Sequence, residues 1–383
     1  MKITLDSIKS DVLAGLVVFL VALPLCLGIA LASGAPLFSG VIAGVVGGII
    51  VGALSKSQIS VAGPAAGLTA IVLGAITSLG TFEAFLLAVF LAGAIQMALG
   101  FARAGAFSSY LPSNVIEGML AAIGVIIIIK QLPYATGWID GRATGGALLV
   151  TAISMSILIA WDAVSRLKKI KVPSALIAVL AGVAINEGLK SAGSSWAMRP
   201  EQLVNLPVPD SAAGFLRLFS LPDFSMISDT RIWIVAATIA AVASIETLLC
   251  IEAADKLDPM KRFTDTNVEL KAQGVGNMIS GLLGGIPMTS VIVRTSANVN
   301  AGAKSKIATI SHGVLLLASV MLIPSALNSI PLACLACVLL KVGFKLASPA
   351  VFRHMWYAGK YQFIPFVVTV GAVVFTDLLK GVG

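Results

Sequence analysis

Ala121-Ala-Ile-Gly-Val-Ile-Ile-Ile-Ile129 is the stretch of this chain that decides its fold class. A chain crosses lipid only as a helix or as a closed β-barrel, because every backbone polar group must be satisfied there. Barrel strands alternate apolar and polar residues over segments of about 10, and this run does not alternate. With its neighbours it forms an apolar span over residues 113–131, close to the roughly 20 residues that a membrane helix needs. The chain is therefore predicted to be an all-α membrane protein.

Similar spans recur along all 383 residues, of which 58% are hydrophobic and 11% are charged. Ordinary soluble domains carry roughly 25% charged residues, so a water-soluble globule is excluded. The predicted spans cover residues 11–32, 37–54, 62–78, 82–102, 113–131, 144–162, 172–189, 231–250, 267–283, 288–301, 306–327, 331–347 and 361–380. We therefore expect a polytopic protein whose partner is the lipid bilayer.

The formal net charge is +8, and the basic residues lie mostly in short loops between the spans. The dense clusters are Arg166 to Lys171, Lys256 to Arg262, Lys304 with Lys306, and Arg353 with Lys360. A cytoplasmic N-terminus places all of them inside, which is the usual bias of membrane proteins. We expect a multi-pass protein of the inner (plasma) membrane, with a cytoplasmic N-terminus and without a nucleic-acid partner.

The longest polar connection, residues 190–230, separates seven predicted spans from six. Because seven is odd, a second half with the same internal order would lie upside down in the membrane, as in inverted-repeat transporters. We predict one transmembrane domain over residues 1–383, with a first repeat at 11–189 and a second repeat at 231–383. The second repeat is one span short, so we expect the chain to be a piece of a longer protein.

Spans three and ten are short, and both open with a break made by glycine and proline. They begin Val61-Ala-Gly-Pro-Ala-Ala-Gly-Leu-Thr69 and Gly285-Ile-Pro-Met-Thr-Ser-Val-Ile-Val-Arg294. Proline suits the first helical turn, so these prolines are predicted to start two half-helices. Half-helices that meet near the midplane present free N–H groups and about half a positive charge each, which favours an anion. An ordinary proline-kinked helix in each half is the alternative.

Two ionisable residues inside predicted spans are the main functional candidates. Arg294 lies about two turns into span ten, and Glu246 lies within span eight. Ionisable groups are costly in a membrane, so each is a functional candidate. Arg294 would add positive potential to the cleft, whereas Glu246 would repel an anion until a proton or sodium ion neutralised it, which would couple the two fluxes. The structural alternative is an ion pair between these two residues. Glu117, Gln96 and His312 are weaker candidates.

Motifs of other protein classes are missing from the sequence. The four cysteines lie in apolar spans, and Cys334-x-x-Cys337 has no second pair or neighbouring histidine that would complete a metal site. There is no nucleotide-binding loop, zinc-protease motif or serine-hydrolase elbow. We expect no enzymatic activity, and no cofactor beyond a co-transported proton or sodium ion.

An ordered series of short segments runs through essentially the whole chain. The segments are Ala22-Leu-Pro-Leu25 with Gly28-Ile-Ala30, Ile59-Ser-Val-Ala-Gly-Pro64, Leu111-Pro-Ser-Asn-Val-Ile116, Glu246-Thr-Leu-Leu249, Gln273-Gly-Val-Gly-Asn277, Gly281-Leu-Leu-Gly-Gly-Ile-Pro287 with Arg294, and Leu339-Leu-Lys-Val-Gly343. Together they resemble the SulP sulfate-permease family, which includes bacterial bicarbonate and sulfate transporters and prestin-like anion exchangers. The resemblance implies a seven-plus-seven inverted repeat and a homodimer. It implies a core domain of spans one to four and eight to eleven and a gate domain of the other spans. The family usually adds a cytoplasmic STAS domain, which this sequence does not contain.

By position, the resemblance also implies a set of residues around the anion. They are Leu25, Ile29, Ala62, Gly63, Ala65, Ser290, Val291, Ile292 and Arg294. Glu246 falls on the acidic position of span eight, with Cys250 one turn later, where the sodium-dependent branch has aspartate and threonine. A thiol is a poor sodium ligand, so proton coupling is favoured. Because Leu25 and Ile29 are apolar, recognition is left to backbone amides, and sulfate, bicarbonate and chloride all stay open.

The leading hypothesis is a secondary active transporter of a small inorganic anion, sulfate or bicarbonate, coupled to a cation and working by alternating access. An uncoupled channel or exchanger for chloride or bicarbonate would use the same pore charges without coupling. A dicarboxylate or nucleobase symporter of the same architecture is the other alternative.

Overall fold

The computed structural model describes residues 5–105, 113–138, 142–163, 173–208 and 212–375. The basic cluster from Arg166 to Lys171, the start of the segment at Leu111, and the chain end from residue 376 lie outside the described residues. Within the described part, seven helices are long and apolar enough to cross a membrane, and four shorter apolar helices accompany them. The prediction of an all-α polytopic membrane protein is confirmed.

The first half of the chain contains α1 (Leu5–Ala32), α2 (Leu37–Val46), the π-helix η1 (Gly47–Val51), α3 (Gly52–Leu54), β1 (Ala62–Pro64), the 3₁₀ turn η2 (Ala66–Leu68), α4 (Thr69–Leu79), α5 (Phe82–Phe101), α6 (Ser113–Thr136), α7 (Gly145–Ala163) and α9 (Ser174–Ser191). The short elements η4 (Pro200–Gln202), α10 (Ala212–Leu216) and η5 (Phe224–Ser228) connect it to the second half. The second half contains α11 (Thr230–Leu257), α12 (Thr266–Leu283), β2 (Met288–Ser290), α13 (Ile292–Asn300), α14 (Ile307–Leu322), α15 (Pro324–Leu327), α16 (Leu332–Leu346), α17 (Pro349–Tyr357) and α18 (Lys360–Phe375).

Each predicted span contains helix, but the ends differ by several residues. The spans 62–78 and 288–301 begin with a strand, and α17 lies outside every predicted span. α11 continues to Leu257, beyond the predicted end at residue 250, because its last turns are polar and hydropathy detects only the apolar part of a helix. The predicted span 306–327 is divided into α14 and α15. Pro324 starts the second piece, because proline lacks the N–H that would continue the helix.

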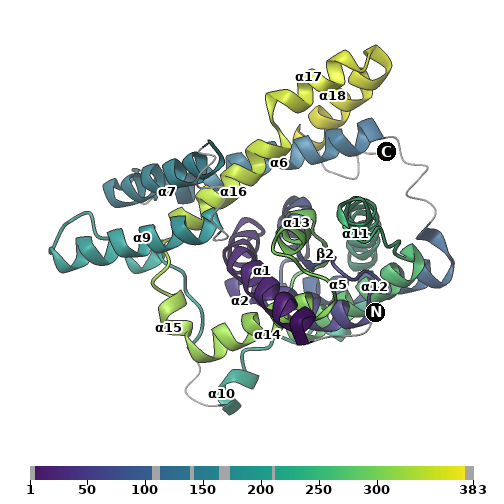
Figure 1. Cartoon of the computed structure of the whole chain (residues 1–383), viewed down its shortest axis with the longest axis horizontal. Coiled ribbons are helices and arrows are strands. Elements are labelled where there is room, and N and C mark those ends of the chain that lie inside the picture. Colours follow the sequence, from purple (N-terminus) through teal and green to yellow (C-terminus); the bar gives the residue numbers. More distant parts are fainter. Residues whose placement is uncertain (1–4, 106–112, 139–141, 164–172, 209–211, 376–383) are drawn as a thin grey trace.

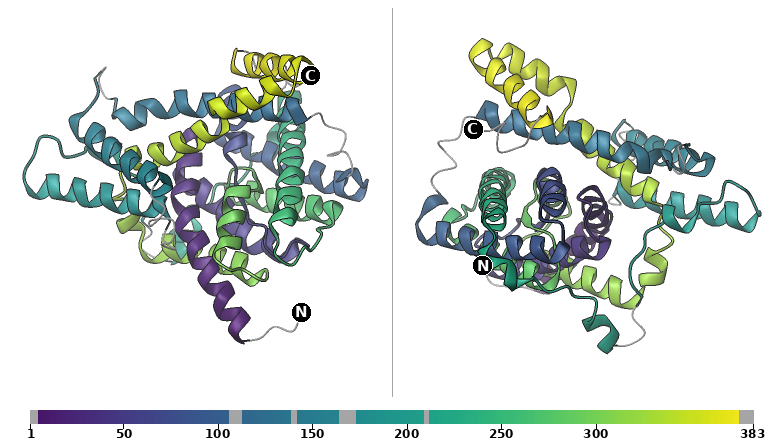
Figure 2. Two further views of the ribbon diagram at one scale, coloured as in Figure 1. Left: turned by 45° about the horizontal axis from the view of Figure 1, so that its top comes forward. Right: turned by 180° about the vertical axis from the view of Figure 1, so that it is seen from behind.

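The helices form two groups. We call α1, α2, α4, α5 and α11–α14 the bundle, and α6, α7, α9 and α16–α18 the arm, which extends along one side of the bundle (Figure 1). Figure 2 shows the same two groups from other directions. They meet where α1 lies against α16 and α9, and where α4 lies against α6. The bundle contains the spans expected in a core domain, and the arm contains those expected in a gate domain.

Glycines allow the bundle helices to approach each other closely. A Cβ at Gly93 of α5 would lie 2.5 Å from the carbonyl oxygen of Gly274 of α12, and a Cβ at Gly274 would lie 2.7 Å from the carbonyl oxygen of Gly93. Any larger residue at either position would force the backbones apart. Helices in membranes associate largely through such close packing, because lipid supplies no hydrophobic drive between them.

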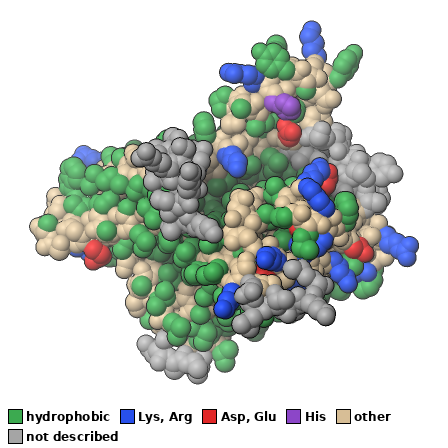
Figure 3. Space-filling model, viewed as in Figure 1, with side chains coloured by type: hydrophobic (Ala, Val, Ile, Leu, Met, Phe, Trp, Pro, Cys, Tyr) green, Lys and Arg blue, Asp and Glu red, His purple; other side chains and the backbone are tan. Residues whose placement is uncertain are grey.

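The outer surface of the arm is apolar. Leu148 and Ile159 of α7 and Leu180 of α9 are 45%, 59% and 55% exposed. Figure 3 shows hydrophobic side chains covering this end of the molecule, while most Lys and Arg side chains lie elsewhere on the same face. Exposed apolar side chains in this number suit contact with lipid.

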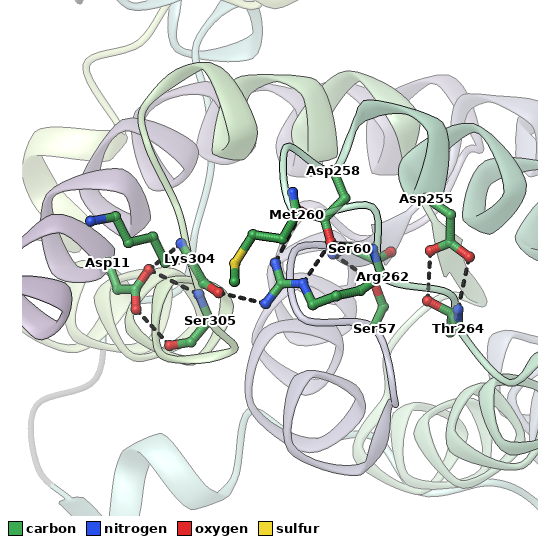
Figure 4. Close-up of polar contacts among 10 residues, drawn as sticks. All are labelled: Asp11, Ser57, Ser60, Asp255, Asp258, Met260, Arg262, Thr264, Lys304 and Ser305. Carbon is green, nitrogen blue, oxygen red and sulfur yellow. Dashed lines mark hydrogen bonds and ion pairs between the residues drawn. The ribbon is translucent and has the colours of Figure 1, made fainter. Parts of the chain in front are cut away.

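Polar contacts connect α1 with two loops at one end of the bundle (Figure 4). Asp11 of α1 accepts a hydrogen bond of 2.6 Å from the backbone N–H of Lys304, and the Arg262 guanidinium donates to the Lys304 carbonyl and to Asp258. Burial alone would raise the pKa of Asp258, but the bonds from Arg262 and from the Met260 N–H outweigh it and lower the pKa below its ordinary 3.8. These contacts join α1 to the loops that follow α11 and α13.

Candidate functional site

Two short strands, β1 and β2, pair with each other inside the bundle, and we call this pair the strand crossing. β1 and β2 pair antiparallel, with Gly63 opposite Thr289 and Ala62 opposite Ser290, and both strands are buried. β1 leads into η2 and α4, and β2 leads into α13. The helices that follow the strands have 11 and 9 residues, so both are half-helices, as predicted.

The two prolines lie elsewhere than the sequence analysis predicted. Pro64 belongs to β1 and Pro287 directly precedes β2, so neither occupies the first turn of a helix. The residues before the helices are Ala65 (φ −111°, ψ 135°) and Val291 (φ −121°, ψ 113°), and both are extended. The φ of proline suits extended chain as well as a helix start, and here it supports the strand crossing. The alternative of a simple kinked helix in each half is also wrong, because the chain is extended before each helix.

Both half-helices begin beside the strand crossing. Because the strands run antiparallel, η2 with α4 and α13 leave the crossing in opposite directions and keep their N-termini near it. The first N–H groups of a helix have no partner within that helix, and the helix dipole adds about half a positive charge. The crossing therefore gathers two partial positive charges at one buried place.

Arg294 of α13 adds a full positive charge to this place. Its side chain is 0% exposed, and Nη2 donates to the Sγ of Cys26 (3.4 Å) and to the carbonyl of Pro64 (3.5 Å). Nε and Nη1 have no hydrogen-bond partner, and no carboxylate of the described residues lies within 4.0 Å of the guanidinium. A Cβ at Gly63 would lie 2.1 Å from Nη1, so only glycine fits there. The guanidinium thus lies directly against β1.

Glu246 of α11 lies against the other half-helix. A Cβ at Gly67 of η2 would lie 2.7 Å from Oε2 and 2.9 Å from Oε1 of Glu246. Oε2 is buried and has no hydrogen-bond partner. Glu246 and Arg294 form no ion pair in the structure, so the structural alternative proposed for them is wrong. Both charges instead lie beside the backbone of the first strand–helix segment, Arg294 against β1 and Glu246 against η2.

The residues predicted to surround the anion all lie on elements that meet at the crossing. Leu25 and Ile29 lie on α1 after Pro24 and are 6% and 3% exposed. Ala62, Gly63, Ala65 and Ser290 are buried, Val291, Ile292, Glu246 and Cys250 are partly exposed, and Cys250 is a free thiol. Their contact with substrate stays a prediction.

The hydroxyl group of Ser290 is already bound by protein groups. It donates to Oε1 of Glu269 (3.1 Å) and accepts hydrogen bonds from Gln273 (3.1 Å) and Ser60 (3.2 Å). Glu269 is completely buried, and the sequence analysis did not select it. The sequence could have indicated Glu269, because it lies inside the predicted span 267–283, where any ionisable residue is a functional candidate.

Asn277 and Gln96 hold β2 in place. The side chain of Asn277 accepts from the Met288 N–H (2.7 Å) and donates to the Met288 carbonyl (3.1 Å) and to Gln96 (2.6 Å). Gln96 in turn donates to Ser244 of α11 (3.3 Å). The weak candidate Gln96 therefore supports the strand crossing from α5, and Asn277 makes the direct contact with β2.

The remaining candidates lie on α14 and in the arm. His312 of α14 is buried, and a Cβ at Gly48 would lie 3.0 Å from its Nδ1. Glu117 lines a cavity of about 390 Å³ in the arm, together with Lys345 and His354. A larger cavity of about 640 Å³ lies between α4, α6, α11 and α18 and is lined mainly by apolar residues. No group of three or more metal-ligating side chains occurs in the described part of the chain.

The sequence matches the model of the sulfate permease family over residues 8–147 and 141–369. It is 28% identical to a putative sulfate transporter, YvdB of Bacillus subtilis, over 99% of this chain and 72% of that protein. It is 27% identical to the bicarbonate transporter BicA of Picosynechococcus sp., over 89% of this chain and 62% of that protein.

Two solved structures are similar to the fold. The transmembrane domain of a cyanobacterial bicarbonate transporter, BicA, has a TM-score of 0.83 at 22% identity and covers 100% of this chain and 99% of that chain. SLC26A9 has a TM-score of 0.81 at 19% identity, over 98% of this chain and 64% of that chain. The chain thus has the inverted-repeat transporter fold that was predicted from its seven-span first half.

Proposed function

The chain belongs to the sulfate permease family, and on that premise we propose that it is a secondary transporter of a small inorganic anion, sulfate or bicarbonate. Its relatives include putative sulfate transporters and bicarbonate transporters. The family consists of transporters, so an enzymatic role has no support.

The observation that carries this proposal is the uncompensated charge of Arg294 at the strand crossing. A buried charge is costly unless it is paired, and no described carboxylate pairs with this one. An anion about 6 Å away would gain about 3 kcal/mol at an effective dielectric constant of about 20. The two helix N-termini would add to this attraction and would bind anions through backbone N–H groups.

We assign cation coupling to Glu246. Its carboxylate lies against Gly67 at the start of a half-helix, and one of its oxygens lacks a partner. When ionised it repels an anion bound nearby, and a proton removes that repulsion. A proton is favoured over sodium because Cys250, one turn later, offers a soft sulfur rather than the oxygen that hard cations prefer.

The proposed motion is a movement of the bundle relative to the arm, which would expose the crossing to each side of the membrane in turn. Such alternating access is typical of inverted-repeat transporters with a site at broken helices. The homodimer and the cytoplasmic N-terminus stay predictions of the sequence analysis.

Uptake of labelled sulfate and labelled bicarbonate into proteoliposomes tests the proposal, with and without imposed proton and sodium gradients. Accumulation of one anion that depends on the proton gradient is the expected result. Passive flux with large single-channel currents would favour the channel alternative. Uptake of neither anion, together with uptake of a labelled dicarboxylate or nucleobase, would favour an organic substrate.

A further inference from the structure

Glu269 of α12 is a second buried carboxylate, with a hydrogen-bond network separate from Glu246. It is 0% exposed, and no basic side chain of the described residues lies within 4.0 Å of it. Its Oε1 accepts from Gln273 (3.0 Å) and from Ser290 (3.1 Å), and its Oε2 accepts from Ser55. Three neutral side chains therefore surround one buried acid.

Each hydroxyl partner of Glu269 is itself bound by a second protein group. The Ser290 hydroxyl accepts from Gln273 and Ser60 and donates to Glu269. The Ser55 hydroxyl accepts from the Ser57 N–H (3.0 Å) and donates to Glu269. The carboxyl group of Glu269 is therefore the point where these hydrogen bonds meet.

Two of the three partners of Glu269, Ser55 and Ser290, belong to the two sides of the strand crossing. Ser55 begins the loop that leads into β1, and Ser60 lies two residues before Ala62. Ser290 ends β2, pairs with Ala62, and is followed by Val291, the residue before α13. One carboxylate thus fastens the entry to β1 and the exit of β2 to α12.

We propose that Glu269 is a positioning residue for anion binding. Through Ser55 and Ser290 it fixes the strand crossing, and through Ser290 it fixes the N-terminus of α13, which starts two residues later. It does not touch the anion, and its carboxyl oxygens are bound by hydroxyl and amide groups of the protein. This inference rests on the proposed function, because it assigns the geometry of the site that the anion would occupy.

Glu269→Gln is the first variant to test. The new amide replaces one acceptor with a donor, which faces groups that themselves donate. Loss of one buried hydrogen bond corresponds to about a tenfold change in affinity. We expect the KM for anion uptake to rise about tenfold while kcat stays within about twofold. Glu252→Gln is the control, because Glu252 is an exposed carboxylate on α11 that pairs only with Lys256.

A double variant that exchanges the side chains at positions 269 and 273 distinguishes a positioning role of Glu269 from a general structural role. Positions 269 and 273 lie one helical turn apart, and both side chains bind Ser290. The double variant Glu269→Gln/Gln273→Glu returns a carboxylate to Ser290, so we expect it to recover part of the lost affinity. A purely structural role predicts lower yield and lower kcat for both variants, with unchanged KM.

Amide hydrogen exchange over residues 286–294 gives a second readout that needs no transport. We expect Glu269→Gln to lose protection there, and Glu252→Gln to keep it. Unchanged KM in Glu269→Gln, or unchanged exchange over this segment, would overturn the proposal. If the wild-type protein took up no inorganic anion, the proposed function would fail, while the exchange data would still decide whether Glu269 holds the crossing.

Discussion

At Gly63 the backbone of β1 passes directly over the guanidinium of Arg294. In Gly63→Ala the added methyl group would lie 2.1 Å from Nη1, and the buried arginine has no solvent to move into. Such overpacking costs about 1–3 kcal/mol and would shift the charge away from the crossing. We expect anion uptake in proteoliposomes to fall at least tenfold, since each 1.4 kcal/mol is a factor of about ten.

Gly74→Ala is the matched control for this prediction. Gly74 lies on α4, the half-helix that follows β1, and a Cβ there would meet nothing within 4 Å. We expect its uptake to equal that of the wild type. Equal uptake by both alanine variants would show that the position of Arg294 does not control transport.

Glu246→Gln tests the coupling assigned to that carboxylate. The amide is neutral at every pH, so the anion no longer meets a charge that a proton must remove. We expect uptake to continue but to lose its dependence on an imposed proton gradient, measured at fixed anion concentration. Gradient dependence that survives the substitution would remove Glu246 from the coupling step.

Hydropathy can identify Arg294 and Glu246 from sequence because a charge inside an apolar span is conspicuous. Glu269 was open to the same argument, but the sequence cannot show which polar groups surround it. Its partner Ser55 lies in a loop more than two hundred positions away along the chain. The Ser290 hydroxyl is a related case, because only the structure reveals that it faces Glu269.

At the scale of elements, the first residue of β2, Met288, is held by the Asn277 side chain of α12. Asn277→Ala would leave the Met288 N–H without its partner and would remove the bond to Gln96. Each unsatisfied buried group costs about 1–3 kcal/mol, so we expect the free energy of unfolding in detergent to fall by about 3 kcal/mol. We also expect the KM for uptake to rise, because β2 leads into α13.

Asn186 provides the comparison for Asn277. It is a buried asparagine of α9 in the arm, and its side chain accepts from the Met198 N–H (2.9 Å), far from the strand crossing. Asn186→Ala should lower stability but leave the KM unchanged. An unchanged KM in both variants would mean that the Asn277 contact stabilises the fold without shaping the site.

Most of the long helices could be predicted to within several residues at each end, whereas the two strands could not. Each helix has its own apolar run, which is a local signal. β1 and β2 have three residues each and exist only because they pair with each other across the two halves of the chain. Pro64 and Pro287 therefore suggested helix starts, and the structure places both in extended chain that a one-dimensional pattern does not distinguish.

At the scale of the whole molecule, the odd number of spans before the 190–230 connection was enough to predict an inverted repeat. The division into bundle and arm came only from the resemblance to a family, because α1 and α16 show no sequence feature that assigns them to different groups.

The contact between α1 and α16 is the clearest place to test whether the bundle and the arm move relative to each other. A Cβ at Gly28 of α1 would lie 3.2 Å from Cγ of Leu339 of α16.

The Cβ of Leu339 is one bond from this Cγ, which brings it within reach of the Cβ–Cβ distance of about 3.5–4.5 Å found in disulfides. The pair Gly28→Cys and Leu339→Cys should therefore form a disulfide across the two groups. The four native cysteines are free thiols and would first be replaced by alanine. If the bundle moves past the arm in every cycle, oxidation should abolish anion uptake and a reductant should restore it.

The control is a disulfide within the arm. The Ser154 hydroxyl of α7 lies 3.5 Å from the Sγ of Cys334 of α16, so Ser154→Cys with the native Cys334 retained should also cross-link. Because α7 and α16 belong to the same group, this bond should leave uptake unchanged. Full uptake by the oxidised Gly28/Leu339 pair would mean that α1 and α16 keep their contact throughout transport, and the moving boundary would then have to lie elsewhere than between bundle and arm.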